Sequence, residues 1–254
     1  MRSFKLVLFV GIFFILPISG CLENEDFSIN QGDTKLKRVL LFFSLDQEAP
    51  TSIVKDYEYD ENGRISKTTS PMYQDGVVVG TISYDLYFYD TSDQLIRKEN
   101  YNANLNAPSG FINLINYIYE YSSAGLKTKE IIEYPIVGID EYMVYEYMSN
   151  QLYSIKKYDK NNVLETYIMY DYDSSDRLIK ETTYFGADDS FISSTVHTYN
   201  GQLQVKSDVY TVNAHMREIK RTFDSANRLI FYESKELQGY SSAMSYILKY
   251  EYFD

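Results

Sequence analysis

The feature that most constrains the fold is a motif that recurs from Tyr57 to the C-terminal end. The pattern is an aromatic residue, a polar turn and then a leucine or isoleucine, and in most copies another aromatic residue lies two positions before the one that precedes the turn. The clearest copies are Tyr57–Ile65, Tyr87–Leu95, Tyr170–Leu178 and Thr222–Leu229, and weaker copies begin at Tyr119, Tyr145, Tyr158 and Thr198. Self-similarity of this kind indicates a fold in which one small structural unit is used many times.

The polar positions of the motif have the chemistry of a tight turn. The first is a short polar residue that can accept hydrogen bonds from the turn backbone, and the fourth is Gly, Asn or Asp, which tolerate positive φ best. A type I turn followed by a bulge residue requires that conformation at the fourth position, so each motif is predicted to be a β-hairpin. The predicted cross-strand pairs are Tyr59 with Ile65, Tyr89 with Leu95, Tyr172 with Leu178 and Phe223 with Leu229.

The segments between the turns alternate with a period of two and are rich in Tyr, Ile, Val and Thr, which is typical of strands. The second aromatic positions are about two strands apart. With a first strand at Lys37–Ser44, the chain is predicted to form an all-β antiparallel meander of about 14–17 strands. A meander of that length must curl, so we expect an up-and-down barrel or a barrel-like sheet. Short turns should gather at one rim, and longer connections, at residues 70–80, 100–110, 135–140, 186–190 and 238–242, at the other.

The N-terminal segment carries the pattern of an export signal. Arg2 and Lys5 precede an apolar run, Leu6–Leu16, which has the length of a signal-peptide core. Ile18–Cys21 follows and resembles the lipobox of bacterial lipoproteins, in which the cysteine is acylated. We therefore expect a signal peptide at 1–20, a flexible tether at 21–34 and one β-repeat domain at 35–254. Acylated Cys21 would anchor the protein in the membrane. Acidic residues directly after Cys21 resemble a surface-export signal, so an outer-membrane lipoprotein facing either the periplasm or the exterior is expected.

Composition narrows the classes of function. The formal net charge is -12, which disfavours a nucleic-acid partner. The chain has one cysteine, so a disulfide scaffold and a cysteine-ligated zinc site are excluded.

The consensus Tyr-x-Tyr-Asp-x-x-Gly-Arg-Leu resembles the YD repeat of the Rhs family, whose large members wind such hairpins into a hollow shell. The likeness covers Tyr57–Asp254, although the copies at Tyr147 and Tyr199 have shortened turns. Together with the lipobox, it is similar to small YD-repeat lipoproteins of Gram-negative bacteria, a group without an assigned function. The resemblance implies a porin-like fold. No counterpart of the autoproteolytic or toxin segments of large Rhs proteins is evident, so the resemblance implies no enzymatic activity.

Motifs for catalysis or metal binding are weak. Asp171, Asp173 and Asp176 lack the glycine and glutamate of a calcium loop, and their positions are those of a strand end and a turn. His197 and His215 are the only histidines, and His197 occupies an aromatic position of the repeat. Nucleophile and phosphate-loop motifs are missing from the sequence. We therefore predict no cofactor, no metal and no catalytic residue.

Tyrosines outside the repeat positions are the best binding candidates, because a phenol joins an apolar face to a hydrogen-bonding tip. Tyr73, Asp75, Tyr101, Asn102 and Tyr240 fall in the expected long connections and are the predicted ligand-binding residues. The leading interpretation is a lipid-anchored, non-enzymatic β scaffold that binds a glycan or another envelope protein.

Two alternatives to this interpretation remain open. One is a hydrolase with an unrecognised carboxylate pair, drawn from residues such as Glu130, Glu133, Asp140 and Glu141. The other is an integral outer-membrane barrel. It requires a continuous apolar band facing lipid, whereas charges such as Lys156, Glu181 and Lys220 are spread over both strand faces.

Overall fold

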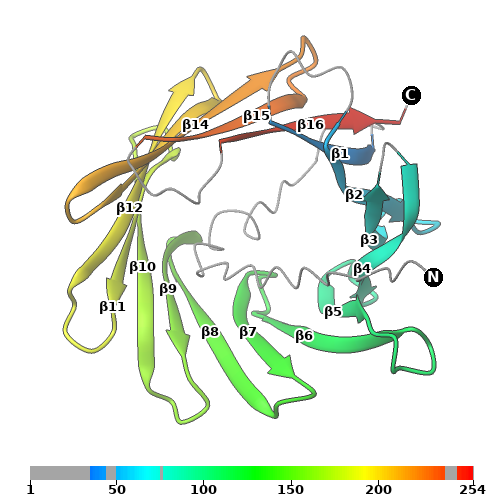
Figure 1. The fold of residues 1–254 in the computed structure, drawn as a ribbon. Helices are drawn as coiled ribbons and strands as arrows, with labels where there is room; N and C mark the ends of the chain where they lie inside the picture. The colour runs from blue at the N-terminus through cyan, green and yellow to red at the C-terminus, as the bar shows by residue number, and fades with distance from the viewer. Residues whose placement is uncertain (1–34, 44–49, 75–76, 238–244, 254) are drawn as a thin grey trace, which may run out of the picture. The chain divides into compact units, whose positions relative to one another are not determined.

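A computed structural model describes residues 35–43, 50–74, 77–237 and 245–253. The chain divides into two units, Met1–Lys35 and Leu36–Asp254. The second unit is a closed barrel of 16 antiparallel strands in which each strand pairs with its neighbours in sequence (Figure 1). The predicted all-β meander and its strand number are therefore confirmed. The signal peptide and the tether, including Cys21, lie outside the described residues.

The strands are separated mostly by connections of two to seven residues. Their bounds are β1 Leu36–Phe42, β2 Ser52–Tyr59, β3 Ile65–Gln74, β4 Val77–Tyr89, β5 Leu95–Ala103, β6 Phe111–Tyr121, β7 Lys127–Tyr134, β8 Ile139–Met148, β9 Gln151–Tyr158, β10 Leu164–Tyr172, β11 Leu178–Phe185, β12 Phe191–Asn200, β13 Leu203–Thr211, β14 Ala214–Phe223, β15 Leu229–Glu236 and β16 Tyr246–Tyr252. None of the described segments is a helix of the length and hydropathy that a bilayer crossing would need.

The hairpin turns have the predicted geometry. Gly63, Asp93, Gly125, Asn162, Asp176 and Asn227 all have φ between 60° and 81°. In the first hairpin, the Asp60 carboxylate accepts hydrogen bonds from the backbone N–H groups of Asn62 and Arg64, both at 2.9 Å. The pairs Tyr59–Ile65, Tyr89–Leu95, Tyr172–Leu178 and Phe223–Leu229 are all opposite one another, each beside a register shift. The repeat therefore encodes strand register as well as turns.

The two rims of the barrel differ broadly as expected. The turns of most repeats lie at one end, which we call the short-turn rim, and the remaining connections form the loop rim. One repeat is an exception, because the Asp159–Asn162 turn joins β9 to β10 at the loop rim. The expected long connection at 70–80 is largely wrong, since β3 and β4 extend through most of it, and the connection expected at 100–110 is confirmed only from residue 104 onward because β5 continues to Ala103. Cross-strand pairing between β3 and β4 favours strand over loop in most of residues 70–80.

The barrel is closed by pairing between its first and last strands. Tyr252 on β16 lies opposite Leu36 on β1, just as Tyr59 lies opposite Ile65 within the first full hairpin. The chain ends on half a repeat, and β1 supplies the aliphatic partner that this half lacks.

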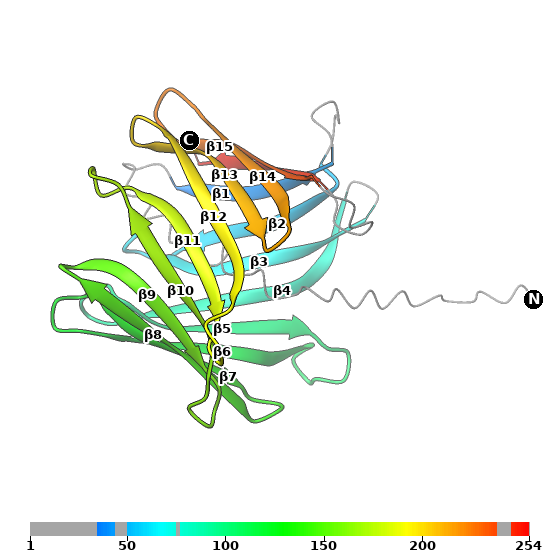
Figure 2. The same cartoon turned by 90° about the vertical axis from the view of Figure 1, so that its left-hand side faces the viewer.

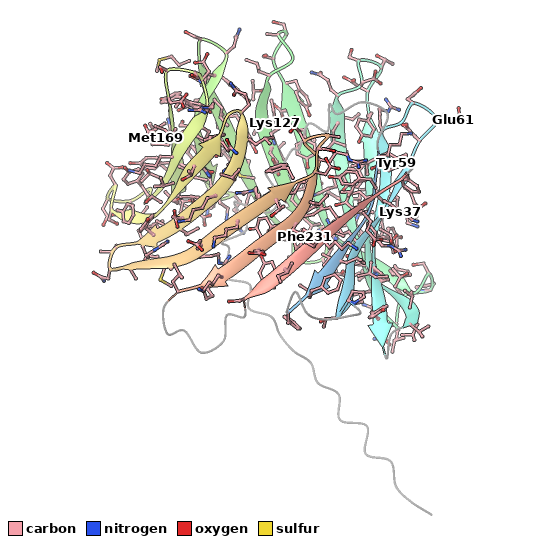
Figure 3. The ribbon with its side chains drawn as sticks, turned by 90° about the horizontal axis from the view of Figure 1, so that it is seen from above. Lys37, Tyr59, Glu61, Lys127, Met169 and Phe231 are labelled. Carbon is pink, nitrogen blue, oxygen red and sulfur yellow. The ribbon has the colours of Figure 1, made fainter. Side chains whose placement is uncertain are left out.

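One face of the sheet is more buried than the other. Tyr57, Tyr145, Ile219, Tyr232 and Leu248 share a face by register with the second aromatic positions of the repeats. This face carries all the buried apolar residues except Leu40 and Ile53. Because side chains on the concave side of a closed barrel converge, we identify it as the inner face. The outer face includes Met169 and Phe231, which are labelled in Figure 3.

Candidate functional site

The inner face carries a ladder of tyrosines near the short-turn rim, where Figure 3 labels its first member, Tyr59, and Glu61 of the adjoining turn. Each tyrosine occupies the second aromatic position of a repeat, and its hydroxyl donates to a backbone carbonyl in the preceding repeat at 2.7–2.9 Å. The donors are Tyr59, Tyr89, Tyr121, Tyr147, Tyr172, Tyr199 and Tyr252, and the acceptors are Leu36, Ile65, Leu95, Lys127, Leu152, Leu178 and Leu229. We call these seven residues the tyrosine ladder.

The ladder is tied to the turns by arginines. Arg64 donates to the Asp60 carboxylate at 2.7 Å, while its guanidinium lies 4.6 Å from the ring centre of Tyr89 in the next repeat. Arg177 and Arg228 have the same relation to their own turns and to Tyr199 and Tyr252. Each arginine therefore links its own turn to the ladder tyrosine of the next repeat.

Burial governs the chemistry of the ladder. It raises the pKa of Tyr59 to about 12 and also raises the pKa of Tyr172, Tyr199 and Tyr252. Phenols held neutral and bonded to backbone carbonyls act as structural donors. The ladder is therefore part of the barrel's framework rather than a reactive site.

The ladder pattern changes on β12 and β14. Phe223 replaces a ladder tyrosine, and His197 and Arg221 stand at positions that are tyrosine in most other repeats. His197 Nδ1 lies 2.9 Å from Ser207 Oγ, and its Nε2 lies 2.9 Å from a Glu181 carboxylate oxygen. This is the order of a serine, histidine and acid triad.

The surroundings of Ser207 argue against catalysis. Its side chain is 1% exposed, and its oxygen also accepts hydrogen bonds from Arg221 and Gln204. A substrate carbonyl would have to reach an oxygen that is buried and surrounded by protein donors. We interpret the cluster as a polar core network, in which His197 is held as a strand residue.

The outer face carries a second group of aromatic residues at the loop rim of β8 to β12. Tyr142 and Tyr158 are stacked with ring centres 5.0 Å apart, and Tyr167 and Tyr184 are stacked at the same separation. Phe191 meets Tyr184 edge-on at 6.4 Å. We call these five half-buried residues the aromatic platform.

Polar groups from two loop-rim connections reach the aromatic platform. The Tyr142 hydroxyl donates to the Asn162 side chain at 2.8 Å, and the Tyr167 hydroxyl donates to the Asp189 carboxylate at 3.0 Å. Burial and the bond to Asp189 raise the pKa of Tyr167. Lys129 lies 4.7 Å from the Tyr142 ring centre. The platform thus combines flat apolar rings with amide, carboxylate and ammonium groups at its edge.

The described residues among those predicted to bind a ligand lie on two strands rather than in loops, and their role in binding stays a prediction. Tyr101 and Asn102 lie on β5 rather than in a loop, and Tyr73 lies on β3. Tyr101 is on the outer face, stacked 4.8 Å from Tyr84, and its hydroxyl donates to Glu99 at 2.9 Å. Asp75 and Tyr240 lie outside the described residues.

The carboxylates named for a hydrolase are divided between the two faces. Glu130 is on the inner face, where it accepts from the Tyr145 hydroxyl at 2.7 Å and from Lys127 at 3.1 Å. Glu133 and Asp140 are opposite each other on neighbouring strands. Among the residues placed by the structure, no group of three His, Cys, Asp or Glu side chains is arranged to hold a metal ion.

Ion pairs join neighbouring strands across the outer face. Lys67 pairs with Glu58 at 3.2 Å, and Lys156 pairs with Glu146 at 2.7 Å. Hydrogen bonds from Lys206 and Lys220 lower the pKa of Glu218 to about 2. A surface of this kind is suited to water, and it interrupts the apolar band that a lipid-facing barrel wall requires.

Reasoning from loops missed the aromatic platform because its members lie within strands. The period-two pattern of β10 contains the missing signal, since Tyr167 alternates out of step with Ile168, Tyr170 and Tyr172 and shares a face with Asp171. A large aromatic residue on the face that carries the charges is the sign of an exposed ring.

Comparisons with known proteins give distant similarities of fold. No protein-family profile and no curated protein matches the chain. Among solved structures, a porin-like protein from Bacteroides vulgatus is 12% identical, with 87% of this chain and 99% of that chain covered and a TM-score of 0.42. A porin-like protein from Bacteroides uniformis is 9% identical, with 86% and 96% covered and the same TM-score.

A third structure, of TcdB2-TccC3, is 12% identical with a TM-score of 0.33. The alignment covers 83% of this chain and 13% of the TcdB2-TccC3 chain. The assignment of a closed barrel rests on the chain's own strand pairing. Membership of the YD-repeat group stays a prediction.

Proposed function

We propose that this protein is a lipid-anchored envelope protein whose barrel binds a glycan at the aromatic platform. The observation that carries the proposal is the pair of stacked tyrosine couples on the outer face, with Asn162 and Asp189 hydrogen-bonded to their hydroxyls. Sugar rings present C–H faces that pack on aromatic rings, and their hydroxyls need amide and carboxylate partners. The platform offers both kinds of group side by side.

The barrel provides a rigid support for such a site. The four platform tyrosines are held by strand pairing on both sides and Phe191 by pairing with β11, so their rings are positioned before a ligand arrives. The lipidation signal that ends at Cys21 supplies the location, since an acylated protein stays at a membrane where envelope glycans are concentrated. Binding without catalysis is consistent with the closed hydrogen-bond network around Ser207.

A binding assay with variants of the platform tests the proposal. Residues 35–254 contain every strand of the closed barrel and can be studied without the preceding segment. A thermal-shift screen against envelope glycans should find a ligand that raises the melting temperature. Tyr184→Ala should then lose at least tenfold in affinity, and Tyr167→Phe, which keeps the ring but not the bond to Asp189, should lose less.

Two control variants locate the site. Tyr210→Ala removes an outer-face ring at the same rim that is stacked on His215, outside the platform, and should bind normally. Tyr101→Ala should also bind normally. Loss of binding in Tyr101→Ala with normal binding in Tyr184→Ala would move the site to β5 and refute the assignment to the platform.

The lipid anchor has its own test. Mass spectrometry of the protein isolated from membranes should show acyl chains on Cys21, and carbonate washing, which removes proteins held only at the lipid surface, should release Cys21→Ala from the membrane fraction. Continued membrane association of Cys21→Ala after carbonate washing would instead favour the integral barrel.

A further inference from the structure

The β3–β4 hairpin extends beyond the sheet to which it belongs (Figure 2). β3 pairs with β2 only as far as Thr69, and β4 begins to pair with β5 at Ser83. Past those points the two strands pair with each other as far as Gln74 and Val77. We call residues 70–74 and 77–82 the arm. Within the described part of the chain, the outer edges of the arm pair with no third strand.

The arm exposes apolar side chains on both of its faces. Val77 and Val78 are successive strand residues and so point to opposite faces, yet their exposed fractions are 61% and 48%. Met72, Val79 and Ile82 are also exposed, at 45%, 53% and 49%. The two strands of the arm carry no charged residue, in a chain with 24% charged residues, and the connection that joins them is Asp75–Gly76. Soluble proteins seldom leave such a surface in water without a use for it.

The edges of the arm are poorly suited to another β-strand. Pro71 on β3 has no N–H to donate. The register shifts twice along β4, so that Val79 and Ile82 have no opposite residue on β3. Prolines and bulges are the devices that prevent edge-to-edge strand addition. The side chains, rather than the backbone edges, are therefore the part of the arm that is available for contact.

A ribbon that is apolar on both faces is covered completely only by a medium that surrounds it. A protein surface would cover one face and leave the other in water, whereas the boundary between lipid headgroups and acyl chains can cover both. At that depth, water and headgroups can still bond to the free backbone edges, which the bilayer centre would not allow.

The net charge of the protein also bears on what can cover the arm. A net charge of -12 repels a second copy and an anionic bilayer alike, whereas a neutral lipid surface exerts no such repulsion on the apolar strands of the arm or on Asp75 between them. We propose that the arm inserts into the interface of a zwitterionic lipid layer and gives the barrel a membrane contact separate from any acyl anchor.

Tryptophan fluorescence gives a direct test, because the chain contains no tryptophan. Val78→Trp places the only indole on the arm, and Val212→Trp places it at a still more exposed valine in the tight β13–β14 connection. Both variants are made in residues 35–254 and mixed with phosphatidylcholine vesicles, with and without brominated acyl chains. Emission of Val78→Trp should shift to the blue and be quenched by brominated lipid, while Val212→Trp should be unaffected.

A charge variant tests whether the arm drives binding. Val78→Asp should lower the vesicle-bound fraction about tenfold or more in co-sedimentation, and Val212→Asp should not change it. Three outcomes would overturn the proposal: no quenching of Val78→Trp, equal quenching of both reporters, or a blue shift of Val78→Trp that depends on protein concentration in the absence of vesicles. The last would show that a second copy covers the arm. None of these measurements depends on glycan binding, so the two proposals can fail separately.

Discussion

The tyrosine ladder and the aromatic platform use the same residue type for opposite purposes. Ladder tyrosines lie on the inner face, donate to backbone carbonyls of the neighbouring repeat and hold the short-turn rim together. Platform tyrosines lie on the outer face at the loop rim, and two of them donate to side chains of the connections, Tyr142 to Asn162 and Tyr167 to Asp189. The phenol ring packs in both settings, and the partner of its hydroxyl decides whether it is framework or surface.

The two regions also differ in how the sequence specifies them. Ladder positions belong to the repeat and recur with its spacing, so every ladder tyrosine makes the same kind of hydrogen bond to a backbone carbonyl. Apart from Tyr158, which begins a weak copy, platform positions lie between repeat positions, and they have no fixed spacing. A repeat can therefore keep its framework constant while the residues between its motifs change, which is the way many scaffolds acquire binding sites.

Removal of one ring from each face of the same strand should separate the two roles most clearly. Tyr145, beside the ladder, is 6% exposed, and Tyr142 belongs to the platform three residues earlier on β8. Tyr145→Ala should lower the free energy of unfolding by about 3–5 kcal/mol because it leaves a cavity against the core. Tyr142→Ala should cost about 1 kcal/mol. Urea unfolding of both variants measures the difference, and Tyr145→Phe serves if Tyr145→Ala does not fold. Equal losses would contradict the distinction.

Alkaline pH should weaken the inner face in particular. Burial raises the pKa of Tyr57 and Tyr59 to about 12, whereas an unfolded phenol ionises near 10. Between these values the unfolded state has lost protons that the folded state retains, so stability falls as the pH rises from about 10 to 12. The effect should be on the order of 2 kcal/mol for a phenol as buried as Tyr57. Urea midpoints at several pH values measure the slope, which Tyr57→Phe should reduce. An unchanged slope in that variant would assign the effect elsewhere.

Phe223 interrupts the tyrosine ladder, and a substitution that restores the hydroxyl should repair it. Phe223 has no hydroxyl, and the carbonyl that corresponds to the other acceptors is that of Gln204, which lies opposite Tyr199 on β13. Phe223→Tyr should add about 0.5–1 kcal/mol of stability, and Tyr172→Phe should remove a similar amount. Calorimetry of the two variants, with the double variant as a check of additivity, tests the prediction. Destabilisation by Phe223→Tyr would show that the gap is required by the His197 network nearby.

Turn residues at the two rims should give the smallest contrast. Asp176 and Asn162 both have φ near 60°, where glycine is favoured over other residues. Asp176→Gly, at the short-turn rim, should stabilise the barrel by about 0.5–1 kcal/mol. Asn162→Gly should give little or no net gain because it also removes the acceptor of the Tyr142 hydroxyl. Thermal unfolding measures both changes, and an equal gain in the two variants would mean that this bond contributes nothing.

The sequence was sufficient to predict what local chemistry dictates. Asp60 and Gly63 specify the turn, the turn sets the opposition of Tyr59 and Ile65, and repetition of that unit yields a meander. Local chemistry was insufficient for the ends of the strands. The β3–β4 hairpin continues through Gln74 and Val77 because the two strands pair with each other, so residues with turn-like composition, including Pro71, became strand.

The candidate site was predicted less well than the fold. Tyrosines in expected loops were chosen, but exposure depends on which face a strand residue occupies in the closed barrel. Tyr167 and Tyr184 become neighbours through the register of β10 with β11, a relation between residues that the chain separates by a whole turn. Strand register also brings together Ser207, His197 and Glu181 from three strands, and no spacing in the sequence predicts these contacts.

The pairing of Leu36 with Tyr252 closes the barrel with the same kinds of residue that pair within the internal hairpins. The junction between β16 and β1 has the same aromatic and aliphatic partners as the internal hairpins, and only the covalent turn is missing. A circular permutant that joins Tyr252 to Leu36 through an Asp-x-x-Gly-x linker and opens the chain at Asp90–Gln94 would preserve every strand neighbour. The β16–β1 junction is thus equivalent in its strand pairing to the internal hairpins, so a permuted chain should build the same wall.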